Sequence, residues 1–219
     1  MSEESRTEHR QLATMHDPSV SVVLLCAGRS TRTRDERNHK LLSKFDNITL
    51  VRRSALVARN SIAARIFAVT GSMRDAMTEE LADIDVTSIY NPAFASGIAG
   101  SIIAGWKHSY ECGYQGCMIM LADMPLISTI NLNRLIEAFI ADAGRSIASA
   151  TCDSQPGNPV ILPRNLNDEV LRLQGDVGAR KLISNCAVPV LDIDIGPAAL
   201  VDVDTPDEIV AAGGIMAFP

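Results

Sequence analysis

A continuous apolar segment, Val20–Cys26, constrains the fold of this chain more than any other feature. Apart from one serine it consists of Val, Leu and Cys, and such a run without alternation is typical of a parallel strand buried on both faces. The run breaks at Gly28 and passes directly into hydroxyl and guanidinium groups, which is how a buried strand delivers a loop to an anionic ligand. A core strand followed by a solvated loop would have the same pattern, so this segment alone leaves both interpretations open.

Further apolar segments alternate with segments of helical spacing along the rest of the chain. Strands are expected at residues 65–70, 86–90, 117–121, 147–152, 160–162 and 188–193. Helices are expected at residues 50–64, 73–82, 97–110 and 128–143, in a short segment ending at 173, from 179 onward and after 205. A turn is expected at 155–159, and Ser96, Ser128 and Thr205 or Asp204 are the expected helix caps. This alternation predicts an α/β fold in which helices cover both faces of a mostly parallel sheet.

Composition sets the class of protein and its partners. The 219 residues suit one large domain, expected at residues 19–219, preceded by a mobile tail at 1–18. The net charge of −6 argues against broad binding to nucleic acid or to acidic lipid. No apolar run approaches the ~20 residues needed to span a bilayer, so no membrane partner is expected.

Cysteine and histidine patterns exclude several kinds of site. The five cysteines are scattered, odd in number and without a C-x-x-C pair, so neither a disulfide framework nor a zinc site is indicated, and a cytoplasmic location fits best. The four histidines share no metal-ligand spacing. A G-x-S-x-G nucleophile motif is absent as well, which gives hydrolase chemistry little support.

The loop after the first strand has the groups that bind phosphate. Gly28 permits a tight exit from the strand, the hydroxyl of Ser30 or Thr31 can donate to phosphate oxygens, and Arg32 and Lys40 can neutralise them. The loop matches neither the Walker signature nor G-x-G-x-x-G. A charged surface loop is the alternative interpretation.

Acidic residues follow two other apolar segments. Asp123 stands at the carboxyl end of an expected strand, and Asp202 and Asp204 form a pair near the end of the chain. Parallel α/β sheets place their ligands at such strand ends, and Mg²⁺ prefers a few carboxylates together with phosphate oxygens and water. Each aspartate taken alone also fits a helix cap or a turn.

Seven motifs in order resemble those of one enzyme family. They are Leu-Cys-Ala-Gly-Arg-Ser-Thr-Arg at 25–32, Lys-Leu-Leu at 40–42, the Asn-Pro, Gly and Ser of 91–101, Ala-Asp-Met-Pro at 122–125, Gly-Asn-Pro at 157–159, 175–180 and Asp-Val-Asp-Thr-Pro at 202–206. The set is similar to the molybdenum cofactor cytidylyltransferase-like branch of the nucleotidyltransferases. That resemblance implies a three-layer α/β/α nucleotidyltransferase fold with a mostly parallel, Rossmann-like sheet.

The resemblance also assigns roles to individual residues. The implied nucleotide-binding residues are Leu25, Ala27, Gly28, Ser30, Arg32, Lys40, Asn91, Gly97, Ser101 and Asp123. Among them Lys40, Arg32 and Asp123 carry the catalytic role, and Asp123 and Asp204 would hold Mg²⁺. The implied acceptor-binding residues are Gly157, Asn158, Pro159, Gly175, Asp176, Gly178 and Arg180.

The implied reaction is transfer of a nucleotidyl group to molybdopterin with release of pyrophosphate. Ala27 stands where the guanylyl branch usually has a second glycine, so the resemblance favours CTP over GTP. The partners implied are a nucleoside triphosphate, a pterin cofactor and a client molybdoenzyme or its chaperone.

Two departures from the family pattern leave alternatives open. Thr33 and Arg34 replace the usual Met-Gly and the loop is lengthened before Lys40, which predicts a mobile flap at residues 33–39 that orders when nucleotide binds. Asn158 replaces a histidine that the family often has in its Gly-x-Pro motif, so the acceptor could differ from that of the family. The alternatives are a related enzyme that uses GTP or another acceptor, or a protein that binds nucleotide or cofactor with little or no catalysis. A nicotinamide oxidoreductase would share the α/β pattern, but G-x-G-x-x-G is missing.

Overall fold

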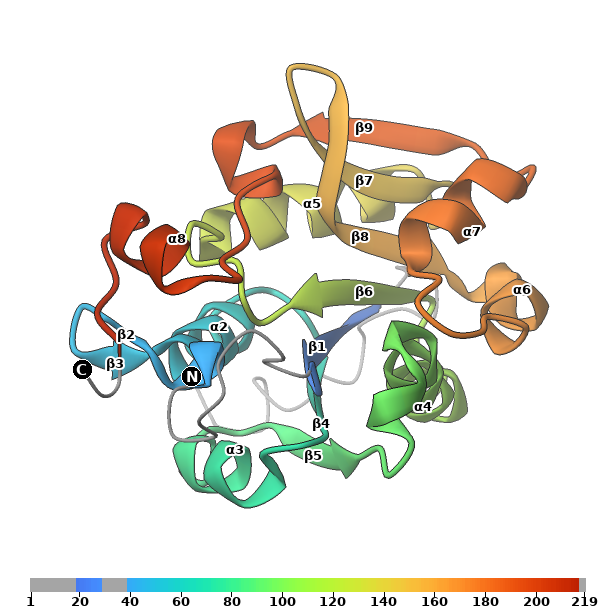
Figure 1. Cartoon of the computed structure of the whole chain (residues 1–219). Coiled ribbons are helices and arrows are strands. Elements are labelled where there is room, and N and C mark those ends of the chain that lie inside the picture. The colour runs from blue at the N-terminus through green and yellow to red at the C-terminus, as the bar shows by residue number, and fades with distance from the viewer. Residues whose placement is uncertain (1–18, 29–38, 217–219) are drawn as a thin grey trace, which may run out of the picture.

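The computed structural model describes residues 19–28 and 39–216. Within these ranges a seven-stranded sheet has the order β5-β4-β1-β6-β8-β7-β9 (Figure 1). Its strands are β1 Val20–Cys26, β4 Arg65–Thr70, β5 Thr87–Tyr90, β6 Gly116–Leu121, β7 Ile147–Cys152, β8 Gln155–Pro163 and β9 Val190–Asp194. Every neighbouring pair is parallel except the two pairs that involve β8. The expected mostly parallel sheet is thus confirmed.

Strand β1 lies in the sheet between β4 and β6, and all seven of its residues are buried. Successive side chains of a strand point to opposite faces. Val22 and Leu24 accordingly enter one apolar core, whereas Val23 and Leu25 enter the other. Because both faces of β1 are buried, its sequence is an unbroken apolar run.

Helices cover both faces of the sheet (Figure 1). Helices α2 Leu50–Arg59, α3 Arg74–Glu80, α5 Thr129–Ala141 and α8 Pro206–Ala211 contribute to the core that contains Leu24. Helices α4 Ile98–Glu111, α6 Asn167–Leu171 and α7 Ala179–Asn185 contribute to the core that contains Leu25. Trp106 of α4 is fully buried in this second core, as its helical spacing predicted. The arrangement is the three-layer α/β/α fold.

Short elements complete the described part of the chain. They are the hairpin β2 Lys44–Phe45 and β3 Ile48–Thr49, and the 3₁₀ turns η2 Lys40–Leu42, η3 Phe94–Ser96, η4 Arg164–Leu166 and η5 Gly196–Ala199. None of the helices at 19–28 or 39–216 has both the length and the apolar character needed to cross a bilayer.

The structure corrects three local expectations. The helix expected at 50–64 ends at Arg59, because the backbone N–H of Ala64 already donates to Val20 at the start of the sheet. The turn expected at 155–159 is the beginning of β8, and the chain reverses earlier, at Asp153 and Ser154, which both have positive φ. Helix α4 has Gly97 rather than Ser96 as its N-cap.

Other expectations are confirmed or fall outside the described residues. Ser128 caps α5 and Thr205 caps α8, each in a capping box. The tail expected at 1–18 and most of the flap expected at 33–39 lie outside the described ranges. His39, the last residue of that flap, is described and is buried, so the flap does not extend to it.

Candidate active site

The carboxyl ends of β1 and β6 lie side by side. Leu25 pairs with Leu121, and the N–H of Ala122 donates to the carbonyl of Leu25 at 3.2 Å. Gly28 and Asp123 therefore leave the sheet at the same edge. Strand β4 lies on the other side of β1, so this edge is also where the chain order reverses, the usual ligand position of open α/β sheets.

A backbone hydrogen bond brings a distant acidic segment to this edge. The N–H of Val203 donates to the carbonyl of Asp123 at 3.0 Å, and the Val203 side chain is buried in the apolar core. Alternate side chains of an extended segment point the same way, so Asp202 and Asp204 both lie on the side of Asp123.

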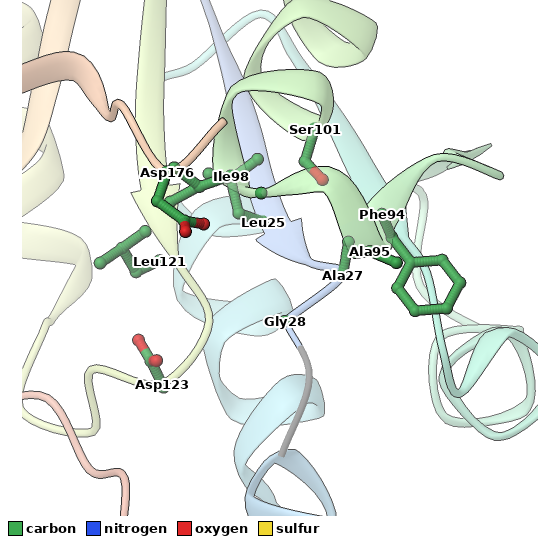
Figure 2. Close-up of a pocket in the computed structure, with 11 residues that line it drawn as sticks. Leu25, Ala27, Gly28, Phe94, Ala95, Ile98, Ser101, Leu121, Asp123 and Asp176 are labelled. Atoms are coloured by element: carbon green, nitrogen blue, oxygen red, sulfur yellow. The ribbon is translucent and has the colours of Figure 1, made fainter. Parts of the chain in front are cut away.

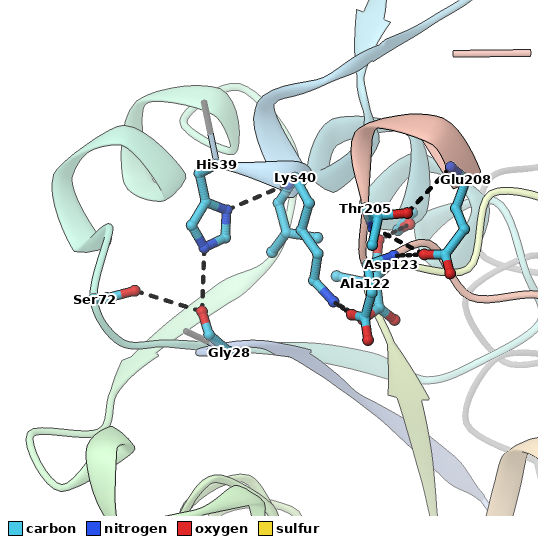
Figure 3. A network of polar contacts seen from close by, with 11 residues as sticks. Gly28, His39, Lys40, Ser72, Ala122, Asp123, Thr205 and Glu208 are labelled. Carbon is cyan, nitrogen blue, oxygen red and sulfur yellow. Dashed lines mark hydrogen bonds and ion pairs between the residues drawn. The ribbon is translucent and has the colours of Figure 1, made fainter. Parts of the chain in front are cut away.

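The start of helix α8 fixes the backbone at Asp204. One carboxylate oxygen of Glu208 accepts the N–H groups of Asp204 at 2.7 Å and Thr205 at 2.8 Å, and the Thr205 hydroxyl accepts the N–H of Glu208 (Figure 3). Accepting these backbone hydrogen bonds holds the pKa of Glu208 below its usual range. The T-x-x-E spacing of a capping box is the sequence signal for this contact.

Lys40 joins two of the acidic residues. Its Nζ donates to Oδ2 of Asp123 at 2.5 Å and to Oδ1 of Asp204 at 2.6 Å, and its side chain is only 12% exposed (Figure 3). Burial alone would lower the pKa of this ammonium, but the contacts with the two carboxylates outweigh burial and raise it. The Lys40 side chain is therefore a fixed positive charge at neutral pH.

The three carboxylates form a set suited to a divalent cation. One ligand oxygen from each of Asp123, Asp202 and Asp204 lies within 4.8 Å of the other two. Oδ1 of Asp123 is buried and has no hydrogen-bond partner within residues 19–28 and 39–216. Burial, followed by the charges of Asp123 and Asp204, raises the pKa of Asp202. A cation would satisfy the unpaired oxygen and offset the repulsion, so these residues fit a metal ion.

Asp202 was not assigned to the metal set from the sequence. The Asp-Val-Asp spacing is the signal that could have included it, because residues two apart on an extended segment share a side.

A cavity of about 420 Å³ opens at the same edge of the sheet (Figure 2). Six of the predicted nucleotide-binding residues line it: Leu25, Ala27, Gly28, Gly97, Ser101 and Asp123. Phe94, Ala95, Ile98, Leu121 and Asp176 complete the lining. Its walls are largely apolar, with the carboxylates of Asp123 and Asp176 and the Ser101 hydroxyl as polar groups. Lys40, another predicted phosphate ligand, contacts Asp123 but is not itself in the lining. Ser30 and Arg32 lie outside the described residues.

Asn91 lies behind the cavity rather than in its lining. It is buried, its amide nitrogen donates to the Ser101 hydroxyl at 3.0 Å, and its amide oxygen accepts the N–H of Ala93. In this structure Asn91 therefore orients Ser101 and holds the turn that leads to Phe94.

The predicted acceptor residues divide between two places. Asp176 lines the first cavity, beside the predicted nucleotide-binding residues, because the preceding Gly175 packs on Gly97 at the start of α4. Gly97 has φ +110°, and a Cβ there would lie 2.2 Å from the Gly175 backbone, so this approach requires glycine. The Asp176 position was expected to face the acceptor.

Three other predicted acceptor residues line a second cavity of about 300 Å³: Gly157, Asn158 and Arg180. Ser149, Ser184 and Asp192 add polar groups to it. The Arg180 guanidinium donates to the carbonyl of Pro156 at 2.8 Å. Pro159, which is buried in β8, and Gly178, the N-cap of α7, are not in the lining of this cavity. Residues 175–180 thus contribute to both cavities.

Comparisons with known proteins agree with this geometry. The family model of the MobA-like NTP transferase domain matches residues 22–190. Among curated proteins, none matches this chain.

Several solved structures share the fold. Rv0371c from Mycobacterium tuberculosis H37Rv is 24% identical with a TM-score of 0.74, and the alignment covers 88% of this chain and 97% of that one. A nucleotidyl transferase from Methanothermobacter is 18% identical, with a TM-score of 0.73 and coverage of 88% and 95%. A molybdopterin-guanine dinucleotide biosynthesis protein A from Archaeoglobus fulgidus is 17% identical, with a TM-score of 0.61 and coverage of 88% and 96%. Because the family model covers residues 22–190, the chain belongs to the MobA-like NTP transferase domain family, a family of nucleotidyltransferases.

Proposed function

We propose that this protein is an Mg²⁺-dependent enzyme that transfers CMP from CTP to the phosphate of molybdopterin and releases pyrophosphate. The observation that carries the proposal is the cluster of Lys40, Asp123 and Asp204, because Asp123 also lines the cavity together with Ala27 and Ser101. The cluster combines a fixed cation with carboxylates beside a space that admits a small molecule. The product would then pass to a client molybdoenzyme or its chaperone.

Asp123, Asp202 and Asp204 would hold the metal ion. The unpaired Oδ1 of Asp123 and the mutual proximity of the three carboxylates support this assignment. Mg²⁺ is proposed because it binds through one or two carboxylates together with substrate phosphates. A solved structure of Rv0371c is described as a complex with manganese, a metal with similar ligand preferences. When bound, the ion would neutralise charge on the phosphates of the nucleotide.

Lys40 would stabilise the departing pyrophosphate. Its ammonium is held in the charged form by Asp123 and by Asp204, and Asp123 lines the cavity. Developing negative charge on a leaving group is stabilised by such a pre-positioned cation. The acceptor phosphate is already an anionic nucleophile, so the reaction depends on positioning and charge neutralisation rather than on a general base.

The nucleoside would occupy the apolar part of the first cavity. The Ala27 methyl and the Ser101 hydroxyl lie in its lining, and Asn91 fixes the direction of that hydroxyl. Ala27 narrows the cavity beside Gly28 relative to a glycine, which supports a pyrimidine over a larger purine base. CTP is proposed rather than GTP chiefly on the family resemblance, because the guanylyl branch usually has a glycine at the position of Ala27.

The acceptor would occupy the second cavity. Arg180 supplies a positive charge there, and Asn158, Ser149 and Ser184 supply hydrogen-bonding groups. Asp176 lines the first cavity and Arg180, four residues later, lines the second, so an acceptor held by Arg180 would lie near the nucleotide that contacts Asp176. That the acceptor in this cavity is a pterin phosphate is proposed from the family resemblance.

A nucleotide-selectivity assay tests the proposal. The protein is incubated with Mg²⁺, molybdopterin and CTP, GTP or ATP in turn, while pyrophosphate release is followed. Release with CTP and only in the presence of the acceptor supports the proposal. Pyrophosphate release with GTP alone would show that the enzyme belongs to the guanylyl branch. Saturable CTP binding without pyrophosphate release would identify a binding or delivery protein. Absence of release with every nucleotide rules out the transferase proposal for this acceptor.

A further inference from the structure

His39 is a buried histidine at the edge of the candidate active site, and none of the roles described so far uses it. Its side chain is 3% exposed, and it directly precedes Lys40. His39 and Gly28 are the two described residues that border the segment 29–38. In Figure 3 the imidazole ring of His39 stands between the Gly28 carbonyl and the start of η2.

Both ring nitrogens of His39 have a defined partner. Nδ1 accepts the backbone N–H of Leu41 at 3.3 Å, and Nε2 lies 3.1 Å from the carbonyl oxygen of Gly28. A backbone N–H can only donate and a carbonyl oxygen can only accept. Nδ1 must therefore be unprotonated and Nε2 must carry the proton, so the geometry selects one neutral tautomer.

The partners of His39 are parts of the candidate active site. Gly28 lines the first cavity, and its carbonyl oxygen also accepts the Ser72 hydroxyl at 3.5 Å. These two contacts occupy the Gly28 carbonyl oxygen and hold the backbone at the exit of β1. On the other side, the bond to Leu41 fixes the first turn of η2, whose first residue is Lys40.

We propose that His39 is a positioning residue that connects the end of β1 to η2, so that Gly28 and Lys40 meet the triphosphate in one fixed arrangement. The inference rests on the proposed function, because it concerns the same nucleotide. Holding the two groups in place before the ligand arrives reduces the ordering cost of binding. With alanine or an exposed histidine at this position, nucleotide binding would itself have to order Gly28 and Lys40, and the affinity would be lower.

Two conservative variants separate the two contacts of the ring. His39→Gln keeps a side-chain N–H that reaches about as far as Nε2, so it retains the donor to Gly28. His39→Asn keeps an acceptor near the position of Nδ1, so it retains the bond to Leu41 but not the one to Gly28. His39→Ala removes both contacts.

The test measures CTP binding in the presence of Mg²⁺ by calorimetry, and KM and kcat in the pyrophosphate assay. We expect His39→Ala and His39→Asn to raise Kd and KM for CTP roughly five- to tenfold, the effect of losing about one hydrogen bond, with a smaller change in kcat. His39→Gln should restore Kd to within about twofold of the wild type. Equal values for the Gln and Asn variants, or an unchanged Ala variant, would overturn the positioning role. If the wild type binds no nucleotide, the proposed function fails instead.

A second measurement is independent of nucleotide. In ¹⁵N-labelled full-length protein, the ring nitrogens of His39 should show the neutral Nε2–H tautomer. His108 provides a contrast, because its Nδ1 lies 3.0 Å from the carbonyl of Ala104 and must carry the proton. A His39 ring that exchanges between tautomers or is charged at neutral pH would contradict the proposed contacts.

Discussion

The ammonium of Lys40 lies 2.5 Å from a carboxylate oxygen of Asp123, 83 residues away in the chain. The same nitrogen lies 2.6 Å from Asp204. The Lys40 ammonium thus contacts carboxylates that could also bind a metal ion, and the two cations would compete for them. A triphosphate that draws the ammonium away from the carboxylates would free them for the metal, so nucleotide and metal should bind cooperatively.

Removing the Lys40 charge should therefore strengthen metal binding while it impairs turnover. We expect Lys40→Met to bind Mn²⁺ at least about tenfold more tightly than the wild type without nucleotide, because a charge-assisted contact no longer competes. Titration followed by the electron paramagnetic resonance of free Mn²⁺ measures this change. The exposed Lys44, substituted as Lys44→Met, is the control and should leave Mn²⁺ affinity unchanged. Weaker Mn²⁺ binding by Lys40→Met would contradict the competition.

Asp123 should be essential for turnover but not for folding. Asp123→Asn removes the carboxylate that contacts Lys40 and supplies the unpaired buried oxygen. We expect the rate of pyrophosphate release to fall more than about 100-fold, as when a pre-positioned electrostatic group is lost. The circular dichroism spectrum should be unchanged. The exposed Asp75 of α3, substituted as Asp75→Asn, is the matched control and should retain wild-type activity. Full activity of Asp123→Asn would refute the metal assignment.

The Ala27 methyl should contribute to nucleotide selectivity. It lies in the lining of the first cavity, so Ala27→Gly enlarges the space beside Gly28. We expect the ratio of kcat/KM for CTP over GTP to fall about tenfold, a typical effect of one methyl group in an apolar pocket. Competition between the two nucleotides in one reaction measures the ratio directly. An unchanged ratio would show that the base is selected elsewhere.

His39 should make the protein less stable in mild acid. Burial lowers the pKa of its imidazole below the ordinary 6.5. Lys40 lowers that pKa further, whereas the Gly28 carbonyl and Asp123 partly oppose the shift. As the pH falls from 6.5 toward the lowered pKa, the unfolded chain binds a proton that the folded chain does not, so the free energy of unfolding decreases. This contribution is fully present above pH 6.5.

Urea unfolding at pH 7.5 and 5.5 tests this prediction. His39→Gln cannot titrate, so it should lose less stability between the two pH values than the wild type. Equal losses in the two proteins would show that His39 does not contribute to the acid sensitivity.

Much of the fold could be predicted from local patterns. The unbroken apolar run of β1, the spacing of Trp106 in α4 and the T-x-x-E box of α8 each report burial or capping within a few residues. The limits predicted for α2 and for the start of β8 were wrong. The limits of these elements depend on pairing with other strands, as in the bond from Ala64 to Val20, and periodicity does not contain that information.

Local sequence patterns predicted the α/β class and identified the residue types that are available to bind phosphate and metal. Which of these residues lie together depends on the folded chain. In the fold, Lys40 contacts Asp123 and Asp204, and Asp202 joins these carboxylates. Asp176 lines the first cavity, whereas Asn91 lies behind it and binds Ser101. His39 is buried against Gly28. The physical reason is that strand periodicity fixes which face a side chain occupies. Contacts such as that between Val203 and Asp123 are set by how the strand ends and the last helix pack together.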